Sequence, residues 1–169
     1  MAKIITEGLE LIGDPVAGRP TLGDSVSVAM FRVLRLVVIM EGLNSIIGDA
    51  SALVYASGKG LGNELGETIF AKAGKDMDKY ISTLANEVKS LGIGIMSVTK
   101  ADPDSGLIEI KVDECITCSG GPNINQRVCH FEAGLISGLL EPLFGKPVNV
   151  VETQCNCMGE DGCLFECRF

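Results

Sequence analysis

The sequence predicts an α+β fold in which helices cover an antiparallel sheet of about four to five strands. Apolar residues recur at helical spacing in the first half of the chain and alternate with polar residues in the second half. Helices that come first and strands that gather later favour this class over a doubly wound parallel sheet. Because 169 residues is the length of one ordinary domain, we expect a lead-in segment at 1–22 and a single domain at 23–169.

The first long helix follows the lead-in segment, which glycines and prolines punctuate. Either Asp24 or Ser25 is suited to cap this helix, and Gly42 predicts a break within it. Its residues are apolar on most sides, so we expect burial on more than one face. Asp49 is then expected to cap a second helix.

The second helix carries small residues four positions apart, among them Gly58, Gly62 and Gly66. Residues at this spacing form a flat stripe along which another helix or a sheet can pack closely. Neither the P-loop pattern nor G-x-G-x-x-G fits these glycines, so we predict a packing surface rather than a nucleotide site. Gly134 and Gly138 leave a similar smooth face on a later helix.

A third helix is predicted from Asp76 to Gly92, because its apolar residues repeat at three and four positions and glycine suits the left-handed residue after a helix. A strand follows at 93–100. The next strand, at about 108–113, alternates apolar with charged residues, which is typical of a half-buried antiparallel partner.

The last third of the chain begins with a loop at 115–127 that is rich in cysteine and glycine. We expect a fourth helix at about 129–144 and a strand at 148–153. After a loop, the final strand places four residues on one face: Cys163, Phe165, Cys167 and Phe169.

The charge balance excludes several classes of protein. There are 14 Lys and Arg against 22 Asp and Glu, a net charge of −8, and the basic residues are scattered, which argues against nucleic-acid binding. Arg32, Arg35 and Glu41 interrupt the most apolar stretch, so we expect no membrane span. The first residues do not resemble a signal peptide, and we therefore expect a cytoplasmic protein with reduced thiols.

All seven cysteines lie between Cys115 and Cys167, so any metal chemistry belongs to this part of the chain. Zinc prefers four tetrahedral ligands and favours thiolates. Composition leaves the ligand set open, because sets that use Cys115, Cys118 or Cys157 are also possible. A Cys₄ iron–sulfur cluster, or seven cysteines that serve only as small buried side chains, are the other interpretations.

The C-terminal pattern carries a resemblance. Cys129 opens a glycine-containing helix, a strand holds Glu152 shortly before Cys155, and Gly159 precedes Cys163-Leu-Phe. With the earlier run Leu-Val-Tyr-Ala-Ser-Gly-Lys-Gly-Leu-Gly, this arrangement resembles the 4-vinyl reductase domain family over about residues 24–169. Relatives include sensor domains of phenol-responsive activators, a bacteriochlorophyll-biosynthesis protein and TRAPP vesicle-tethering subunits.

The resemblance implies a small, usually dimeric domain with an antiparallel sheet covered by helices, and a zinc ion held by three cysteines and one glutamate. Matched position by position, the ligands are Cys129, Glu152, Cys155 and Cys163. Residues three apart on a regular strand face opposite ways, so this set requires a bulge near residues 153–154. The only histidine, which follows Cys129, is expected beside the metal or at the surface, and Glu160-Asp161 in a solvated turn.

The resulting functional hypothesis is a zinc-containing binding module for a small hydrophobic, aromatic or tetrapyrrole-like molecule, acting as a sensor, carrier or accessory protein. The residues expected to line its pocket also suit an ordinary core: Phe31, Leu34, Tyr55, Met96, Ile110 and Phe131.

Two alternatives remain open. One is an enzyme, or an enzyme subunit, that reduces a vinyl group of a tetrapyrrole; it is the weaker hypothesis because the sequence shows no dinucleotide fingerprint and no defensible catalytic set. The other is a dimeric scaffold subunit whose glycine-striped helices form the dimer surface, and a homodimer is expected in any case.

Overall fold

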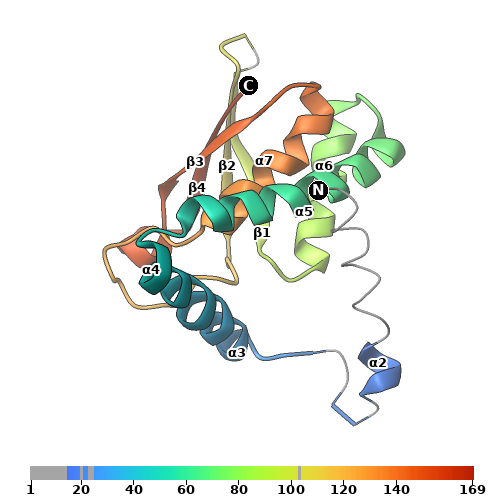
Figure 1. Cartoon of the computed structure of the whole chain (residues 1–169). Coiled ribbons are helices and arrows are strands. Elements are labelled where there is room, and N and C mark those ends of the chain that lie inside the picture. Colours follow the sequence, from blue (N-terminus) through green and yellow to red (C-terminus); the bar gives the residue numbers. More distant parts are fainter. Residues whose placement is uncertain (1–14, 20, 23–24, 103) are drawn as a thin grey trace.

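The computed structural model describes residues 15–19, 21–22, 25–102 and 104–169. In these ranges three long helices and a four-stranded antiparallel sheet form the main body, which confirms the predicted α+β class (Figure 1). Most of the expected lead-in segment lies outside the described residues, and its described part includes the short helix α2 (Pro15–Gly18).

The sheet has the strand order β1-β2-β4-β3, and every neighbouring pair is antiparallel. Its strands are β1 (Ile95–Asp102), β2 (Leu107–Asp113), β3 (Asn149–Gln154) and β4 (Cys163–Arg168). The predicted alternation is confirmed in the two central strands, since one face of each is buried: Ile108, Ile110 and Val112 in β2, and Cys163, Phe165 and Cys167 in β4. A register shift between Val98 and Lys100 interrupts β1.

The main helices are α5 (Ser51–Ala73), α6 (Met77–Ser90) and α7 (His130–Phe144). The α6 and α7 helices pack against the sheet, and α5 packs against α7 (Figure 1). Asp76 caps α6 by accepting a hydrogen bond from the Lys79 N–H, and Gly92 has a φ of 68°, so both predicted ends of this helix are confirmed.

The predicted glycine packing surface lies between α5 and α7. A Cβ atom added at Gly58 or Gly62 would overlap the backbone of α7, and one added at Gly134 or Gly138 would overlap the backbone of α5. The two helices can therefore approach closely only because glycine has no side chain at these positions. Because these stripes face each other inside the chain, they are not available as the dimer surface that we expected of them.

Residues 28–47 form a helical stretch made of α3 (Val28–Arg32), a π-helical segment η1 (Val33–Glu41) and α4 (Gly42–Ile47). It projects from the main body (Figure 1). The cap is Ser27, whose hydroxyl accepts from the Met30 N–H, rather than Asp24, which lies outside the described residues, or Ser25. The backbone stays helical through Gly42, where the helix changes type, so the predicted break is absent.

The expected burial of this helix on several faces is wrong. Most of its large apolar side chains face outward, with Leu34 46% and Val38 57% exposed, whereas Arg35 is buried. The reason is that the two arginines at 32 and 35 find polar partners on the main body and turn inward, which leaves the apolar residues outside.

In the part of the chain that the structure describes, no helix combines the length and apolar character needed to cross a bilayer.

Candidate functional site

Five cysteines and one glutamate meet at one end of the sheet, and we call this group the cysteine cluster. Cys115 and Cys118 come from the loop after β2, Cys129 from the start of α7, and Cys163 from the start of β4. The other two members, Glu152 and Cys155, come from β3 and its end. All six side chains are buried.

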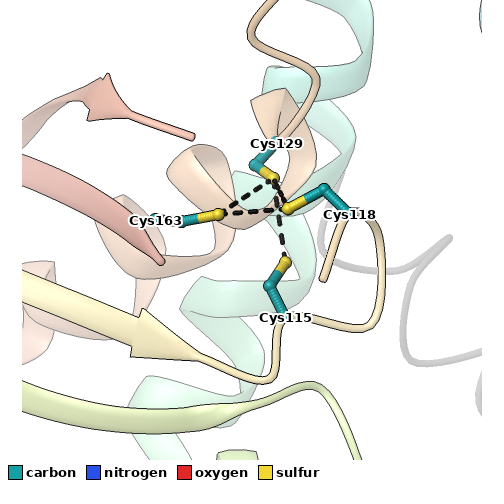
Figure 2. A group of neighbouring side chains, drawn as sticks. All are labelled: Cys115, Cys118, Cys129 and Cys163. Carbon is teal, nitrogen blue, oxygen red and sulfur yellow. Dashed lines mark hydrogen bonds between the residues drawn. The ribbon is translucent and has the colours of Figure 1, made fainter. Parts of the chain in front are cut away.

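The sulfur atoms of four cluster members lie in contact (Figure 2). The Sγ of Cys129 is 3.7 Å from that of Cys115, 3.5 Å from that of Cys118 and 3.7 Å from that of Cys163. The Cys118 and Cys163 sulfurs are 3.1 Å apart. These four Sγ atoms all lie within 4.8 Å of one another, so they form one potential ligand set.

The set that the resemblance implied is also brought together. One ligand atom from each of Cys129, Glu152, Cys155 and Cys163 lies within 4.8 Å of the others. Glu152 Oε2 accepts a hydrogen bond of 3.1 Å from the Cys129 backbone N–H, while its Oε1 is buried and has no hydrogen-bond partner. Burial, followed by the hydrogen bond and charge of Cys155, raises the pKa of Glu152 to about 8.

The predicted bulge makes the second set possible. The register of β3 against β4 shifts between Glu152 and Gln154, so that one extra residue, Thr153, stands in β3. This extra residue allows Glu152 and Cys155, three positions apart, to reach the same cluster. The need for a bulge at this point is therefore confirmed.

Contacts between the thiols shift their ionisation in opposite directions. Hydrogen bonds from neighbouring cysteines, Cys118 first, lower the pKa of Cys115 and of Cys155. The same contacts, led in each case by Cys115, raise the pKa of Cys118, Cys129 and Cys163. The cluster thus favours thiolates at Cys115 and Cys155.

Arg32 fixes the loop that carries Cys115 and Cys118. Its guanidinium group donates to the carbonyl oxygen of Ile116 at 2.6 Å and to that of Ser119 at 2.7 Å. Within the loop, the Cys115 carbonyl oxygen accepts from the Cys118 and Ser119 N–H groups. These hydrogen bonds hold the two cysteines on one tight turn beside the end of the sheet.

Two polar residues of the segment after β3 support the cluster from the other side. Asn156 Oδ1 accepts from the Ser119 hydroxyl at 3.0 Å and lies 3.7 Å from the Cys118 sulfur. Glu160 Oε2 accepts from the Cys155 N–H at 2.6 Å. Of the pair expected in a solvated turn, Asp161 is fully exposed, whereas Glu160 is partly buried and its carboxylate orients the backbone of a cluster residue.

A second buried polar group lies next to the loop. Glu132 on α7 accepts from the Thr117 hydroxyl at 2.6 Å and from the Arg35 guanidinium at 2.7 Å. Burial raises the pKa of Glu132, and the Arg35 charge opposes that rise. The Arg35 guanidinium also lies 4.5 Å from the ring centre of Phe131 and 5.7 Å from that of Phe31. Sequence reasoning missed this group because its members are far apart along the chain.

The geometry of the cluster fits a single thiophilic cation in each set. Four sulfurs at 2.3 Å from a tetrahedral zinc ion stand about 3.8 Å apart, close to most of the separations found here. In an iron–sulfur cluster the thiolates surround an inorganic core, which needs wider spacing than four sulfurs all within 4.8 Å. The donor set therefore favours individual cations over such a cluster.

Three chemically notable residues lie outside both ligand sets. His130 is half-buried, and burial lowers its pKa. Cys157 and Cys167 are buried, and burial raises the pKa of Cys157, and that of Cys167 to about 12. Buried thiols of raised pKa are inert, so these two cysteines serve as core side chains.

The six residues predicted to line a pocket lie in several places. Met96 and Ile110 belong to the main core, against which Tyr55 and Phe131 pack. Phe31 lies near Arg35, and Leu34 is exposed on the projecting helix. Tyr55 also lines an open depression beside Val148 and Phe169.

Two other hollows bear on ligand binding. A cavity of about 70 Å³ lies between α5, α6 and α7, beside Leu84, Leu135 and Leu139. A groove of about 340 Å³ lies between the projecting helix and residues 124–130, with Leu36, Met40, Ile124, Val128, Arg127 and His130 among its lining residues. Two of its lining residues, Val128 and His130, flank Cys129 of the cysteine cluster in the chain.

Comparison with known proteins agrees with the architecture of this site. The family model of the 4-vinyl reductase domain, abbreviated V-4-R, matches residues 108–169, which include the whole cysteine cluster. The uncharacterized protein MJ0150 of Methanocaldococcus jannaschii is 33% identical over 145 residues, which cover 86% of this chain and 77% of that protein. The chain belongs to the 4-vinyl reductase domain family.

Solved structures share the fold of this 4-vinyl reductase domain. The phenol-responsive sensory domain of the transcription activator PoxR, solved with phenol, has a TM-score of 0.61 at 17% identity, covering 85% of this chain and 74% of that one. Trafficking protein particle complex subunit 3 from Naegleria fowleri, covalently bound to palmitic acid, has a TM-score of 0.62 at 17% identity, covering 83% and 93%.

Proposed function

We propose that this 4-vinyl reductase domain is a metal-containing module that binds a small hydrophobic molecule in the groove beside the cysteine cluster. The metal is zinc or a similar thiophilic cation, held by buried cysteines and Glu152. The observation that carries the proposal is the groove itself, because it joins an apolar wall on the projecting helix to the residues that flank Cys129.

Size and enclosure favour the groove, because the depression beside Tyr55 is larger, at about 470 Å³, but lies more open to solvent. A cavity of about 150 Å³ holds benzene in another protein, so the 70 Å³ space between the helices is too small for an aromatic ring. The groove, at about 340 Å³, falls in the range typical of ligand pockets. Its apolar residues include Leu36 and Ile124, and Arg127 and His130 offer polar groups that can orient a ligand.

The fold neighbours suggest the first probes. The PoxR domain was solved with phenol and the trafficking subunit with palmitic acid, so phenol and palmitate represent an aromatic and an aliphatic ligand. We expect one of them to bind the metal-loaded full chain with a stoichiometry of one, measured by calorimetry and by chemical-shift changes at His130.

A pair of variants locates the site. Leu36→Trp fills the groove and is expected to weaken binding at least tenfold, whereas Val38→Trp changes the exposed side of the same helix and should leave binding unchanged. Equal affinity in both variants would exclude the groove. Failure of hydrophobic probes to bind, together with a purified protein that yields no hydrophobic molecule on extraction, would contradict the binding function.

A further inference from the structure

The six donors of the cysteine cluster form two overlapping groups of four. One group contains Cys115, Cys118, Cys129 and Cys163, and the other contains Cys129, Glu152, Cys155 and Cys163. The groups share two members, Cys129 and Cys163. Two tetrahedra that share an edge have this composition: six corners, of which two belong to both.

The distances agree with a shared edge. The Cys129 and Cys163 sulfurs are 3.7 Å apart, and two thiolates bound to one tetrahedral zinc ion stand about 3.8 Å apart. Each remaining pair comes from its own segment, since Cys115 and Cys118 lie on the loop after β2, whereas Glu152 and Cys155 lie at the end of β3.

Neither group alone accounts for both notable features of the cluster. The first group explains the sulfur contacts of Cys115 and Cys118, but it leaves the buried Glu152 Oε1 without a partner. The second group gives the Glu152 carboxylate a cation, but it leaves the buried thiols of Cys115 and Cys118 in contact with its cysteines. Occupation of both groups satisfies all six donors.

The charge of the cluster points the same way. Five thiolates and one carboxylate carry six negative charges when all are ionised, so the six donors can act together as ligands only if cations compensate that charge. Buried charge without compensation is strongly unfavourable. One divalent cation leaves four of these negative charges, and a second cation leaves two. The positively charged guanidinium of Arg32, which donates to carbonyl oxygens of the adjoining loop, lies close to the cluster.

We infer that the cysteine cluster is a binuclear site that binds two divalent thiophilic cations, one in each group, with the thiolates of Cys129 and Cys163 bridging them. Cys115 and Cys118 complete the first ion, and Glu152 and Cys155 complete the second. Each bound thiol releases its proton to solvent. This inference rests on the proposed metal centre and adds a second ion to it.

The number of bound ions is the direct test. Native mass spectrometry of the full chain loaded with zinc is expected to show two ions per chain. Titration of the metal-free chain with Co²⁺ under reducing conditions should produce thiolate charge-transfer absorption that levels off at two equivalents. Because bridging thiolates couple the spins of two Co²⁺ ions, the EPR signal per cobalt should be weaker at two equivalents than in a chain with one.

Paired variants assign each ion. The double variant Cys115→Ser with Cys118→Ser should bind only the second ion. The double variant Glu152→Gln with Cys155→Ser should bind only the first ion, and in both variants the Co²⁺ EPR signal should be that of an uncoupled ion. Cys167→Ala removes a buried thiol outside the cluster and should keep both ions. Circular dichroism checks that each variant has folded.

The outcomes separate this inference from the proposed function. A folded wild-type chain that saturates with one ion contradicts the binuclear site, and the variants then show which group holds that ion. A folded wild-type chain that binds no ion contradicts the metal centre of the proposed function as well.

Discussion

At the scale of single residues, Tyr80 shows how a polar group is accommodated where three helices meet. Its side chain is fully buried, and the hydroxyl donates to the Leu139 carbonyl oxygen at 2.6 Å and lies 3.2 Å from that of Gly66. One hydroxyl thereby joins α6 to both α5 and α7. Burial, with a smaller contribution from Glu67, raises the pKa of Tyr80 to about 12.

This shift predicts a loss of stability at alkaline pH. The unfolded chain releases the Tyr80 proton near pH 10 and the folded chain near pH 12. The protonated hydroxyl therefore stabilises the fold fully below pH 10, and this stabilisation is lost as pH rises from 10 to 12. The loss at pH 11 is about 1.4 kcal/mol. We expect Tyr80→Phe to be less stable than wild type by about 1 kcal/mol at pH 8.

The measurement is urea denaturation of both proteins at pH 8 and at pH 11. The wild-type advantage should disappear at the higher pH, because only the wild type loses the Tyr80 contribution. A difference between the two proteins that is the same at both pH values would contradict the assignment.

The residues of the candidate site differ in how far the sequence could reveal them. Cys129, Glu152, Cys155 and Cys163 were predicted from the resemblance to the family, whose pattern follows the chain through a helix start, a strand and its hairpin partner. The approach of Cys115 and its neighbour to the same place depends on Arg32, which reaches the loop from more than 80 positions away. A contact over this sequence distance cannot be predicted from local sequence patterns.

At the scale of elements, the glycines of α5 and α7 set the distance between the two helices. Helix packing at ordinary distances places side chains between the axes, and here glycine on both sides removes them. The four-residue spacing of the glycines is a local pattern, so the sequence could predict a close-packing surface on this helix. It could not identify α7 as the element that packs there.

We therefore predict that a methyl group in this contact is destabilising. Gly62→Ala would press its Cβ onto the Leu135 carbonyl oxygen and the backbone of Gly138, which should cost about 1–3 kcal/mol or more in the free energy of unfolding. Gly42→Ala is the matched control, since Gly42 is helical and has open space around its Cα.

Chemical denaturation of both variants checks this prediction. The control should be neutral or more stable by up to about 1 kcal/mol, because alanine favours helix. Equal stability of the two variants would mean that the helices are not in close contact.

The projecting helix shows the limit of hydrophobic patterning. An apolar run predicts that a helix is buried, but it does not identify the surface that covers it. Here the polar contacts between this helix and the main body are made by Arg32 and Arg35. Those contacts depend on carbonyl and carboxylate groups that the sequence does not place. The helix was thus predicted correctly as an element and wrongly in its orientation.

At the scale of the whole molecule, the exposed apolar side chains of residues 28–47 form the surface on which we expect a second copy to pack. Met30, Leu34 and Val38 recur at helical spacing, and each is about half exposed. Contiguous apolar surface of this kind marks interaction sites. This surface replaces the glycine stripes as the predicted dimer contact.

Leu34→Asp with Val38→Asp is accordingly expected to shift the protein from dimer to monomer, measured by size exclusion with light scattering. Ser82→Asp with Asn86→Asp adds the same charge to the exposed side of α6 and should leave the dimer intact. A wild-type chain that stays monomeric at high concentration would contradict the prediction.

The register shift in β1 bears on which surfaces can associate. β1 stands at one end of the strand order, and its residues 97–101 are exposed. A regular end strand offers an unbroken row of backbone donors and acceptors to which another chain can add, and such addition leads to open-ended aggregation. The irregularity between Val98 and Lys100, together with the lysine itself, disrupts that row. The fold thus discourages growth through its sheet, and the predicted dimer contact lies instead on a helix, where contact between two copies can close.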